Sequence, residues 1–471
     1  MVSDGGEGSV YGFRLSSVVP ATVTGEDKVH GLSNMDLAMK LHYLKGVYFF
    51  RREAVEGLTI SDLKEPMFEW LKLYYPTSGR IRRSESGRPM IRCNDGGVRI
   101  VEAQCDKSVD EWMAMEDHDI HNCLTYDQVL GPDLAFSPLV FIQLTWFKCG
   151  AMSVGLSWAH VLGDVVSASD FINMWGSIMA DHAPPRSLGT NPTSPKPQFH
   201  QKLSQKPFSL KMTHPIGDHW LLPRANHPRM GTRYFHVTLD QLKRLLSAHS
   251  GPHAQSQPFQ LLSAIMWKTL AKIQGESEPK IVTVCRNSYG ERGDDEILKN
   301  AMVVSRVEAD IGVAEADVSD LAKLIAEKTV CENGMIEETV GGDDGKSDFI
   351  VYGANLTFVN LEEVKLFGLE IQGHKPVWAS YSIGGVGDEG AFLVLPAPDG
   401  DGGRTVTAIL PENQLAWLRR ELKDEWEKNR ANIYAILHSV WMAGNNKKNK
   451  SYKKIHVCVI WVLLNTKKHI C

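Results

Sequence analysis

The sequence predicts an α/β protein of two domains, and three observations support this fold class. The chain has 471 residues, which is too many for one compact hydrophobic core. Segments in which apolar residues alternate, as in strands, are interspersed with segments in which they recur at helical spacing. A long segment rich in Pro, Ser, Thr and Lys separates the two halves. We predict a first domain over residues 1–182, a crossover linker over 183–228, a second domain over 229–443 and a disordered tail over 444–471.

Strands and helices alternate in the first half. The apolar pattern predicts strands at residues 13–19, 47–50, 139–147 and 152–159, and helices at 61–73 and 111–119. Ser33 is expected to cap another helix, with Asp36 in its first turn, because a carboxylate is stabilised at the positive end of a helix. The helix that ends near residue 73 is terminated by Pro76.

Two hairpins are expected in this half. Residues 91–98 should form one, since Asn, Asp and Gly at 94–97 tolerate the positive φ angles of a tight turn. The strands at 139–147 and 152–159 should pair through the turn at 148–151 and lie at the centre of the first domain.

The second half shows the same mixture of patterns. Strands are expected at residues 232–239, 281–285, 302–307, 350–359, 391–395 and 405–410, and helices at 240–248, 259–273, 317–338 and 412–427. The acidic glycine segment 341–345 lacks the lysine and the strand-loop-helix context of a phosphate-binding loop, so we expect it to be exposed to solvent.

Composition limits the classes of function. Hydrophobic residues are 43% and charged residues 23% of the chain, which is ordinary for a soluble globular protein. The net charge of -5 argues against a nucleic-acid surface, which needs a basic stripe. The 8 cysteines form no C-x-x-C pair and no metal-like spacing with histidine, so we expect reduced thiols and no metal site.

Targeting signals are also informative. Residues 1–11 contain no apolar segment of a signal peptide, and no apolar run reaches the roughly 18 residues of a membrane span. We therefore expect a cytoplasmic protein. The tail joins a basic stretch at 446–454 to a short apolar run at 455–464. Contact with an anionic membrane surface is one interpretation, and a disordered extension is the one that composition favours.

The candidate catalytic residue is His160. It follows the alternating strand 152–159 and precedes Gly163, which offers a turn into a helix beginning near Val165. A histidine held there by a rigid strand, with its ring reaching solvent or a cleft, suits a general base. The alternative is a histidine that serves only packing or hydrogen bonding, which is the commoner case for a single one among 17. Similarly, we expect Trp146, Trp158, Trp175 and Trp267 to pack in cores rather than line a ligand channel.

Six motifs in order nevertheless resemble one family. They are the segments 32–36 (L-S-x-x-D), 75–80 (Y-P-x-x-G-R), 91–103, 136–139 (F-S-P-L), 160–164 (H-x-x-x-D) and 264–268 (A-x-x-W-K). Each one is weak by itself, but together, at the expected separations, they resemble the BAHD acyltransferases of plants. Members transfer acyl groups from acyl-CoA to alcohols or amines. The resemblance implies two chloramphenicol-acetyltransferase-like domains, each a mixed sheet flanked by helices, with the site in a channel between them.

Longer blocks resemble one subgroup of that family, the eceriferum or glossy proteins of cuticular-wax synthesis. These blocks are residues 14–20, 35–43, 129–134, 155–164 and 352–360. The subgroup is tied to the elongation of very-long-chain acyl-CoA, and it is thought to work with the membrane-bound condensing enzyme of the elongase. A monomeric fold and a place at the cytosolic face of the endoplasmic reticulum are consistent with this.

The chain also departs from the family pattern. The usual form is H-H-x-x-x-D-G, whereas Ala159 replaces the first His and Val165 replaces the Gly. The second family motif, D-F-G-W-G, is expected within residues 366–374, where its Asp and Trp are missing. In the family this motif supports the site structurally.

The resemblance implies roles for two residues and for a co-substrate. His160 would be the general base, and Asp164 would turn away from the ring and pair with an arginine, as a structural support of the site. Acyl-CoA would be a co-substrate, with no bound cofactor and no metal. Residues that bind CoA or the oxyanion are left open. The alternative is an accessory module without catalysis, which sets the chain length of the product made by the condensing enzyme.

Overall fold

A computed structural model describes most of the chain. It covers residues 9–25, 27–115, 120–126, 133–182, 206–217, 219–222, 229–249, 257–287, 297–398 and 402–422. All of these belong to one compact unit, Met1–Lys423. The predicted tail, 444–471, and the end of the predicted helix 412–427 lie outside the described residues.

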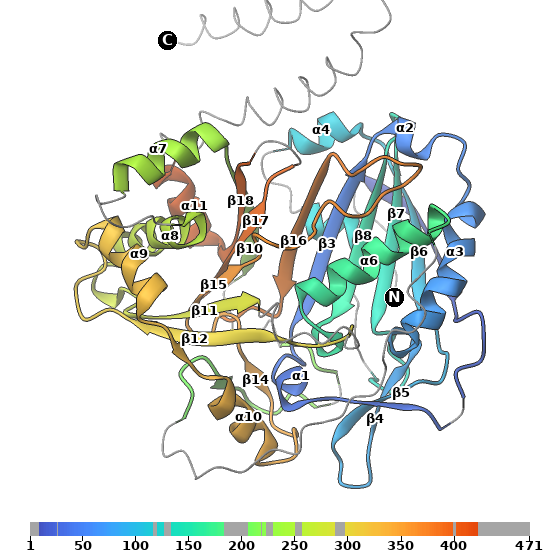
Figure 1. Cartoon of the computed structure of the whole chain (residues 1–471), viewed down its shortest axis with the longest axis horizontal. Helices are drawn as coiled ribbons and strands as arrows, with labels where there is room; N and C mark the ends of the chain where they lie inside the picture. Colours follow the sequence, from blue (N-terminus) through green and yellow to red (C-terminus); the bar gives the residue numbers. More distant parts are fainter. Residues whose placement is uncertain are drawn as a thin grey trace, which may run out of the picture. The chain divides into compact units, whose positions relative to one another are not determined.

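A six-stranded mixed sheet forms the first half of the molecule (Figure 1). In spatial order its strands are β1 (Val10–Val18), β6 (Val98–Cys105), β7 (Val140–Phe147), β8 (Met152–Ala159), β3 (Tyr43–Phe50) and β16 (Trp378–Gly384). Only β6 and β7 are parallel; the other neighbours are antiparallel. The predicted hairpin of 139–147 and 152–159 is confirmed, because β7 and β8 pair throughout. It lies in the middle of the sheet, where it fixes the position of His160 at the end of β8.

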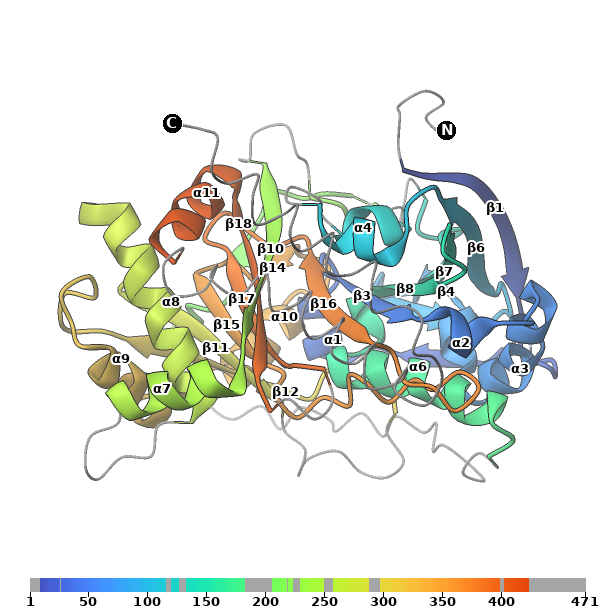
Figure 2. The same ribbon diagram turned by 90° about the horizontal axis from the view of Figure 1, so that it is seen from above.

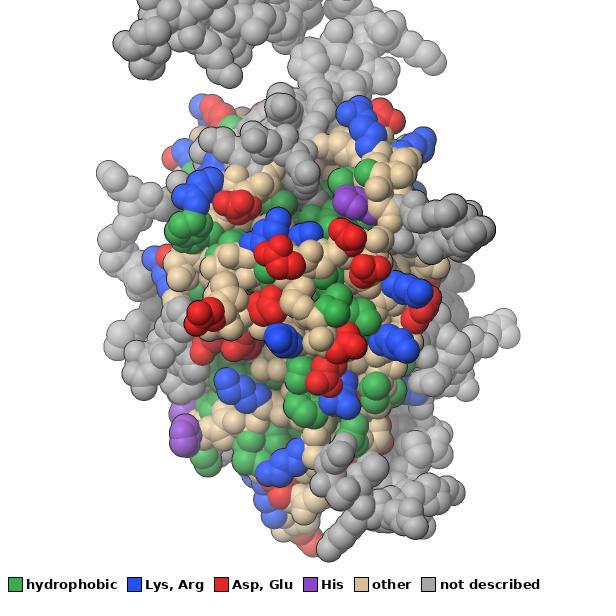
Figure 3. All heavy atoms as spheres, turned by 90° about the vertical axis from the view of Figure 1, so that its left-hand side faces the viewer, with side chains coloured by type: hydrophobic (Ala, Val, Ile, Leu, Met, Phe, Trp, Pro, Cys, Tyr) green, Lys and Arg blue, Asp and Glu red, His purple; other side chains and the backbone are tan. Residues whose placement is uncertain are grey.

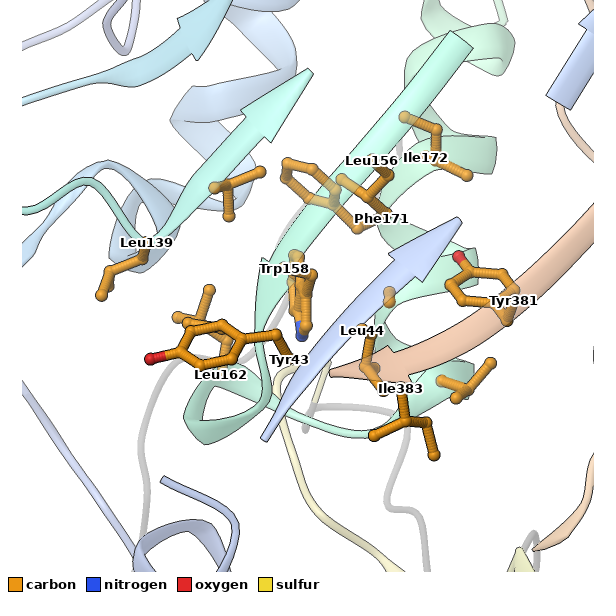
Figure 4. Packing of buried hydrophobic residues seen from close by; sticks show 14 of the residues in the cluster. Tyr43, Leu44, Leu139, Leu156, Trp158, Leu162, Phe171, Ile172, Tyr381 and Ile383 are labelled. Atoms are coloured by element: carbon orange, nitrogen blue, oxygen red, sulfur yellow. The ribbon is translucent and has the colours of Figure 1, made fainter. Parts of the chain in front are cut away.

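Helices cover both faces of this sheet. On one face, α3 (Ile60–Leu73) packs against α6 (Val165–Met179). Trp70 of α3 contacts Phe171 of α6, which also contacts Trp158 of β8. Figure 4 shows Trp158 and Phe171 within this core. On the other face lies α5 (Ile120–Leu124), with the Leu124 carbonyl directly over Gly155, where a Cβ would lie 1.8 Å from that oxygen.

A seven-stranded mixed sheet forms the second half. Its strands, in order, are β10 (Met230–Val237), β18 (Arg404–Pro411), β17 (Ala391–Pro396), β15 (Leu356–Asn360), β11 (Ile281–Asn287), β12 (Met302–Glu308) and β13 (Val330–Cys331). The helices α7 (Leu239–His249), α8 (Pro258–Gln274), α9 (Val318–Glu327) and α11 (Glu412–Glu421) gather beside this sheet (Figure 2).

The remaining elements are short. They are β2 (Val29–Gly31), α1 (Asn34–Ala38), α2 (Arg52–Val55), η1 (Tyr75–Ser78), β4 (Arg80–Arg83), β5 (Pro89–Arg92), α4 (Val109–Met113), η2 (His160–Leu162), β9 (Lys211–Met212), η3 (Gly275–Ser277), α10 (Asn333–Gly341) and β14 (Phe349–Ile350). The expected cap of α1 is confirmed: Ser33 accepts from the Asp36 N–H, and the Asp36 carboxylate accepts from the Ser33 N–H.

Strand β16 joins the two halves, and the apolar pattern did not predict it. It belongs to the second half of the sequence but pairs antiparallel with β3 of the first sheet. The Tyr48 and Tyr381 hydroxyls, one on each strand, lie 2.8 Å apart and are buried. The first sheet therefore takes a strand from beyond the predicted boundaries.

The predicted hairpin at 91–98 is wrong, although its turn exists. Asp95 and Gly97 have φ angles of 52° and 80°, as the residue types suggested. However, β5 pairs with β2 and β4 in a small sheet, whereas β6 pairs with β1 and β7. The turn thus passes the chain from one sheet to another, because both strands find longer-range partners that the local pattern does not reveal.

Two other predicted elements are divided. The helix expected at 317–338 consists of α9 and α10 with the short strand β13 between them. The strand expected at 350–359 is split into β14 and β15 around Gly353, whose φ of +80° and contact with the Gly387 backbone require glycine. This interruption brings Tyr352 to the site described below.

The described part of the predicted linker is packed against the rest of the unit. Strand β9 pairs with β14, and Trp220 is buried, with its carbonyl accepting a hydrogen bond from Tyr43 at 3.0 Å. Residues 183–205 lie outside the described part of the chain. The crossover is therefore partly a structural element of the fold.

Within the described residues, no helix is long and apolar enough to cross a membrane. On the face that Figure 3 presents, Lys and Arg side chains are interspersed with Asp and Glu. That face thus has no stripe of a single charge sign, in keeping with the net charge of -5.

Candidate active site

His160 lies directly after β8, in the short 3-10 helix η2, and is completely buried, with 0% of its surface exposed. Its backbone N–H donates to the His42 carbonyl at 3.2 Å. Its ring Nε2 lies 3.0 Å from the Tyr352 hydroxyl oxygen. The strand does hold the histidine as predicted, but the expectation that its ring reaches solvent or a cleft is wrong, because Tyr352 packs against it.

Asp164 shapes the turn rather than facing the ring. It is the N-cap of α6, and its Oδ1 accepts from the Val166 and Ser167 N–H groups at 3.1 and 3.2 Å. Its Oδ2 accepts from the Ala301 N–H at 3.1 Å. These contacts are those of a structural support. The arginine partner that the resemblance implies stays a prediction.

The turn between these two residues also requires glycine. Gly163 has a φ of 144°, and a Cβ there would lie 2.9 Å from the Lys299 backbone nitrogen. The Lys299 carbonyl accepts from the Asp164 N–H at 3.2 Å. The segment 299–301 of the second half therefore docks onto the H-x-x-x-D turn.

Asn300 connects the turn to the first helix. Its Nδ2 donates to the His160 carbonyl and to the Asp36 carboxylate, each at 2.8 Å. Burial raises the pKa of Asp36, and hydrogen bonds from Ser33 and Asn300 offset part of that rise. Asp36 is thus both a helix cap and a support of the His160 backbone, which ties the L-S-x-x-D motif to the site.

A second histidine, His42, lies beside the first, with the ring centroids 6.5 Å apart. Its Nε2 accepts from the Val351 and Tyr352 N–H groups at 3.0 and 3.4 Å. A nitrogen that accepts hydrogen bonds carries no proton, so the proton of this neutral ring is on Nδ1. Burial, and then the nearby His160, lower its pKa to about 3. His42 is therefore a neutral acceptor that positions the backbone of Tyr352.

Tyr352 completes a buried cluster of three rings. Its ring centroid lies 4.9 Å from that of His42 and 5.5 Å from that of His160. Its hydroxyl contacts the Met302 sulfur at 3.0 Å as well as His160 Nε2. The three rings come from the start of β3, the end of β8 and the break between β14 and β15, so the tertiary fold alone assembles them.

The electrostatic setting keeps His160 neutral. Burial lowers its pKa to about 4, while its own carbonyl, the Asp164 charge and the Asn300 side chain offset part of the fall. Nδ1 of the ring makes no hydrogen bond, and Nε2 is the nitrogen that faces the Tyr352 hydroxyl. In the tautomer whose proton is on Nδ1, Nε2 carries the lone pair. An unprotonated Nε2 is the form of imidazole that can take a proton from a hydroxyl.

No group of three or more His, Cys, Asp or Glu side chains suited to a metal occurs in the described part of the chain. Cys93, Cys105, Cys123, Cys149, Cys285 and Cys331 are free thiols. Trp158, Trp175 and Trp267 are fully buried, and Trp146 is partly buried against the core.

Similarity to known proteins agrees with the geometry. Residues 13–425 match the Transferase family. The chain is 42% identical to Protein ECERIFERUM 2 of Arabidopsis thaliana over 432 residues, which are 88% of this chain and 99% of that protein. This chain belongs to the Transferase family, the family of the BAHD acyltransferases.

Solved structures confirm the predicted BAHD fold. The crystal structure of vinorine synthase matches with a TM-score of 0.67 at 18% identity, over 88% of this chain and 98% of that one. The structure of F. graminearum TRI101 complexed with coenzyme A and T-2 mycotoxin matches with a TM-score of 0.64 at 13% identity, over 85% and 98%. At these identities the likeness establishes the fold alone.

The segment that replaces D-F-G-W-G of the BAHD family packs on α6. The Asn173 side chain and the Ser169 hydroxyl donate to the Lys365 carbonyl at 2.9 and 3.1 Å. Leu366, Leu369 and Ile371 are buried. Gly176 of α6 also lies against the Glu370 backbone. The segment thus still braces the helix that Asp164 caps, with apolar packing in place of the missing Asp and Trp.

Sequence reasoning missed three site residues: His42, Asn300 and Tyr352. No spacing rule selects them, because each is brought to His160 from a distant segment. The signal was indirect: His42 and Tyr352 lie in the two blocks, 35–43 and 352–360, that carried the subgroup resemblance. Asn300 lies in no such block.

Proposed function

We propose that this chain acts on acyl-CoA in the very-long-chain fatty-acid elongation that supplies cuticular wax, with His160 as the general base. Membership of the BAHD family supports an acyl-CoA donor. The subgroup resemblance of residues 35–43, 155–164 and 352–360 supports the elongation pathway. One observation carries the catalytic role: Nε2 of a buried imidazole, whose pKa is lowered by burial to about 4, lies 3.0 Å from a hydroxyl oxygen.

In the proposed reaction, Nε2 of His160 takes the proton of an acceptor hydroxyl or amine as that atom attacks the thioester carbonyl carbon of acyl-CoA. A tetrahedral oxyanion forms and then collapses with cleavage of the C–S bond. The proton on His160 passes to the departing thiolate, which leaves as free CoA. Asn300 holds the His160 carbonyl and Asp164 holds the turn that follows it, and neither gains nor loses a proton.

A second candidate function is an accessory module without catalysis, which sets the chain length of the product made by the condensing enzyme. Two observations favour it. The Tyr352 hydroxyl already contacts His160 Nε2, the nitrogen that a base must present to the acceptor substrate. The segment 366–374 also lacks the Asp and Trp of the family motif. In this alternative the fold is kept for binding an acyl chain or the partner.

The purified full chain distinguishes the two functions. It would be incubated with long-chain acyl-CoA and a panel of alcohols and amines while free CoA thiol is measured. Acyl transfer predicts release that depends on the acceptor and falls by about 10²–10⁴ in His160→Ala, the usual contribution of a general base. His214→Ala, which removes an exposed histidine, is the matched control. Release that is absent across the panel, or unchanged in His160→Ala, would favour the accessory role.

For either function we propose a place at the cytosolic face of the endoplasmic reticulum, beside the membrane-bound condensing enzyme. Co-purification of the full chain with that enzyme from detergent-solubilised membranes would support this arrangement. Recovery of the chain in the cytosolic fraction alone, with the condensing enzyme present in excess, would contradict it.

A further inference from the structure

The Tyr352 hydroxyl stands where an acceptor hydroxyl would have to stand. Its oxygen is 3.0 Å from His160 Nε2, within the range that base catalysis requires between a base and the hydroxyl it deprotonates. Both side chains are fully buried. The base is therefore already occupied by a group of its own chain.

The fold holds Tyr352 there from both sides. Its N–H and that of Val351 donate to His42 Nε2, and its carbonyl accepts from the Gly387 N–H at 2.9 Å. The next residue, Gly353, lies so close to Gly387 that a Cβ would be 2.5 Å from the Gly387 nitrogen. The backbone is thus fixed, so the Tyr352 hydroxyl can move only by rotation about the bonds of its side chain.

The hydroxyl proton of Tyr352 has two possible acceptors, His160 Nε2 and the Met302 sulfur, each 3.0 Å from the oxygen. A thioether sulfur is the weaker acceptor of the two. In the His160 tautomer that can act as a base, the proton is on Nδ1 and the Tyr352 hydroxyl donates to Nε2. Because Nε2 has one lone pair, it cannot accept from Tyr352 and from a substrate hydroxyl at the same time.

We propose that Tyr352 is a gate on His160, so that an acceptor reaches Nε2 only after the Tyr352 side chain has swung away. The gate gives the function of this chain a closed resting state, which an acyl acceptor or a bound partner must open. It rests on the proposed role of His160 as a base. His42 is the positioning residue of this gate, because it holds the Tyr352 backbone while the side chain moves.

Chemical modification of His160 tests the gate directly. Diethyl pyrocarbonate acylates the unprotonated nitrogen of a histidine, and peptide mass spectrometry of the full chain gives the rate at each site. In the wild type His160 should react far more slowly than exposed His214. Tyr352→Phe should raise the His160 rate by about five-fold, the factor that one net hydrogen bond of about 1 kcal/mol contributes to an equilibrium. Tyr352→Ala, which removes the ring, should raise it further.

Two controls make this experiment specific. Tyr381→Phe removes another buried tyrosine hydroxyl, which is bonded to Tyr48, and should leave the His160 rate unchanged. His236 in β10 is a buried histidine whose rate reports global unfolding. If the Ala variant does not fold, the Phe variant alone decides. The gate is overturned if diethyl pyrocarbonate modifies His160 at the wild-type rate in both Tyr352 variants. It is also overturned if His160 of the wild type reacts as fast as His214.

Release of CoA by the same variants separates the gate from the proposed function. If modification of His160 rises in the Tyr352 variants and acceptor-dependent CoA release rises with it, both proposals are supported. If modification rises while no variant releases CoA, the gate stands and the base role fails. If release depends on His160 but Tyr352 changes neither quantity, the base role stands and the gate is overturned.

Discussion

At the scale of single residues, the site depends on two neutral histidines with different tasks. His160 presents Nε2 to a hydroxyl, whereas His42 uses Nε2 to accept two backbone N–H groups. Accepting these two N–H groups leaves no proton on His42 Nε2, and the base role proposed for His160 requires the same of its Nε2. The sequence predicted the first histidine from its place after a strand, but the second is recognisable only from its contacts in the fold. Burial is what gives both rings the same charge state.

This charge state predicts a loss of stability in acid. The folded pKa values of His160 and His42 are about 4 and about 3, below the unfolded value near 6.5. From pH 6.5 down to about 4 the unfolded chain therefore binds protons that the folded chain does not, so the free energy of unfolding falls with pH. Above pH 6.5 this contribution is constant. In all, this contribution is about 3 kcal/mol for His160 and about 5 kcal/mol for His42.

His42→Gln tests the contribution of one ring, since an amide oxygen can still accept from the two N–H groups but does not titrate. Urea denaturation between pH 7 and 4.5 should show a smaller fall in unfolding free energy for the variant than for the wild type. The comparison also cancels Asp36, whose raised pKa acts in the opposite direction. Equal pH dependence in the two proteins would show that His42 is not held neutral.

At the scale of elements, the local rules worked where an element is decided by its own residues. The caps of α1 and the hairpin of β7 and β8 follow from Ser33, Asp36 and the apolar alternation. The rules failed where a distant partner decides. The turn at Asp95 and Gly97 is real, but its two flanking strands join different sheets. Of the two site residues that the sequence predicted, Asp164 proves to be a helix cap, a role that its position before a helix indicates.

Asp164 gives a prediction about this cap. Asp164→Ala leaves the buried N–H groups of Val166, Ser167 and Ala301 without their acceptor, and should lower the free energy of unfolding by about 3 kcal/mol. Asp164→Asn keeps one acceptor oxygen and should lose about 1 kcal/mol. Urea denaturation measures both. Equal stability of the Ala variant and the wild type would exclude the structural role.

Gly155 gives a prediction about the packing of α5 on β8. A Cβ at this position would lie 1.8 Å from the Leu124 carbonyl oxygen, so Gly155→Ala must displace the α5 segment and should cost about 3 kcal/mol. Gly31→Ala is the matched control, because Gly31 is also in a strand and a Cβ added there would have no other atom within 4 Å. A variant pair of equal melting temperature would contradict the packing described here.

At the scale of the whole molecule, the α/β class and the family fold were predictable, and the crossing of β16 was not. The family fold was predictable because its motifs occur in the expected order along most of the sequence. The pairing of β16 with the first sheet cannot be recognised from the local sequence, because β16 has the composition of any buried strand. The domain boundaries at 182 and 229 therefore stay a prediction. The first sheet contains strands from both halves of the sequence.

Strand β16 predicts that the first half does not fold alone. A fragment of residues 1–182 leaves the buried edge of β3 without its partner and exposes Tyr48, which contacts Tyr381 in the whole chain. We expect this fragment to be insoluble or to lack a cooperative melting transition, and to be rescued by co-expression with residues 183–471. A sharp transition of the isolated fragment would contradict the shared sheet.

The most direct test of the central claim is the replacement of His160 by Ala in a reconstituted fatty-acid elongase that contains the condensing enzyme and this chain. The variant must first show the wild-type melting temperature and the wild-type association with the condensing enzyme. If His160 is the base of acyl transfer, the very-long-chain products that depend on this chain disappear in the variant and persist in His214→Ala. Undiminished products with the His160→Ala variant would contradict the catalytic role and leave the accessory function.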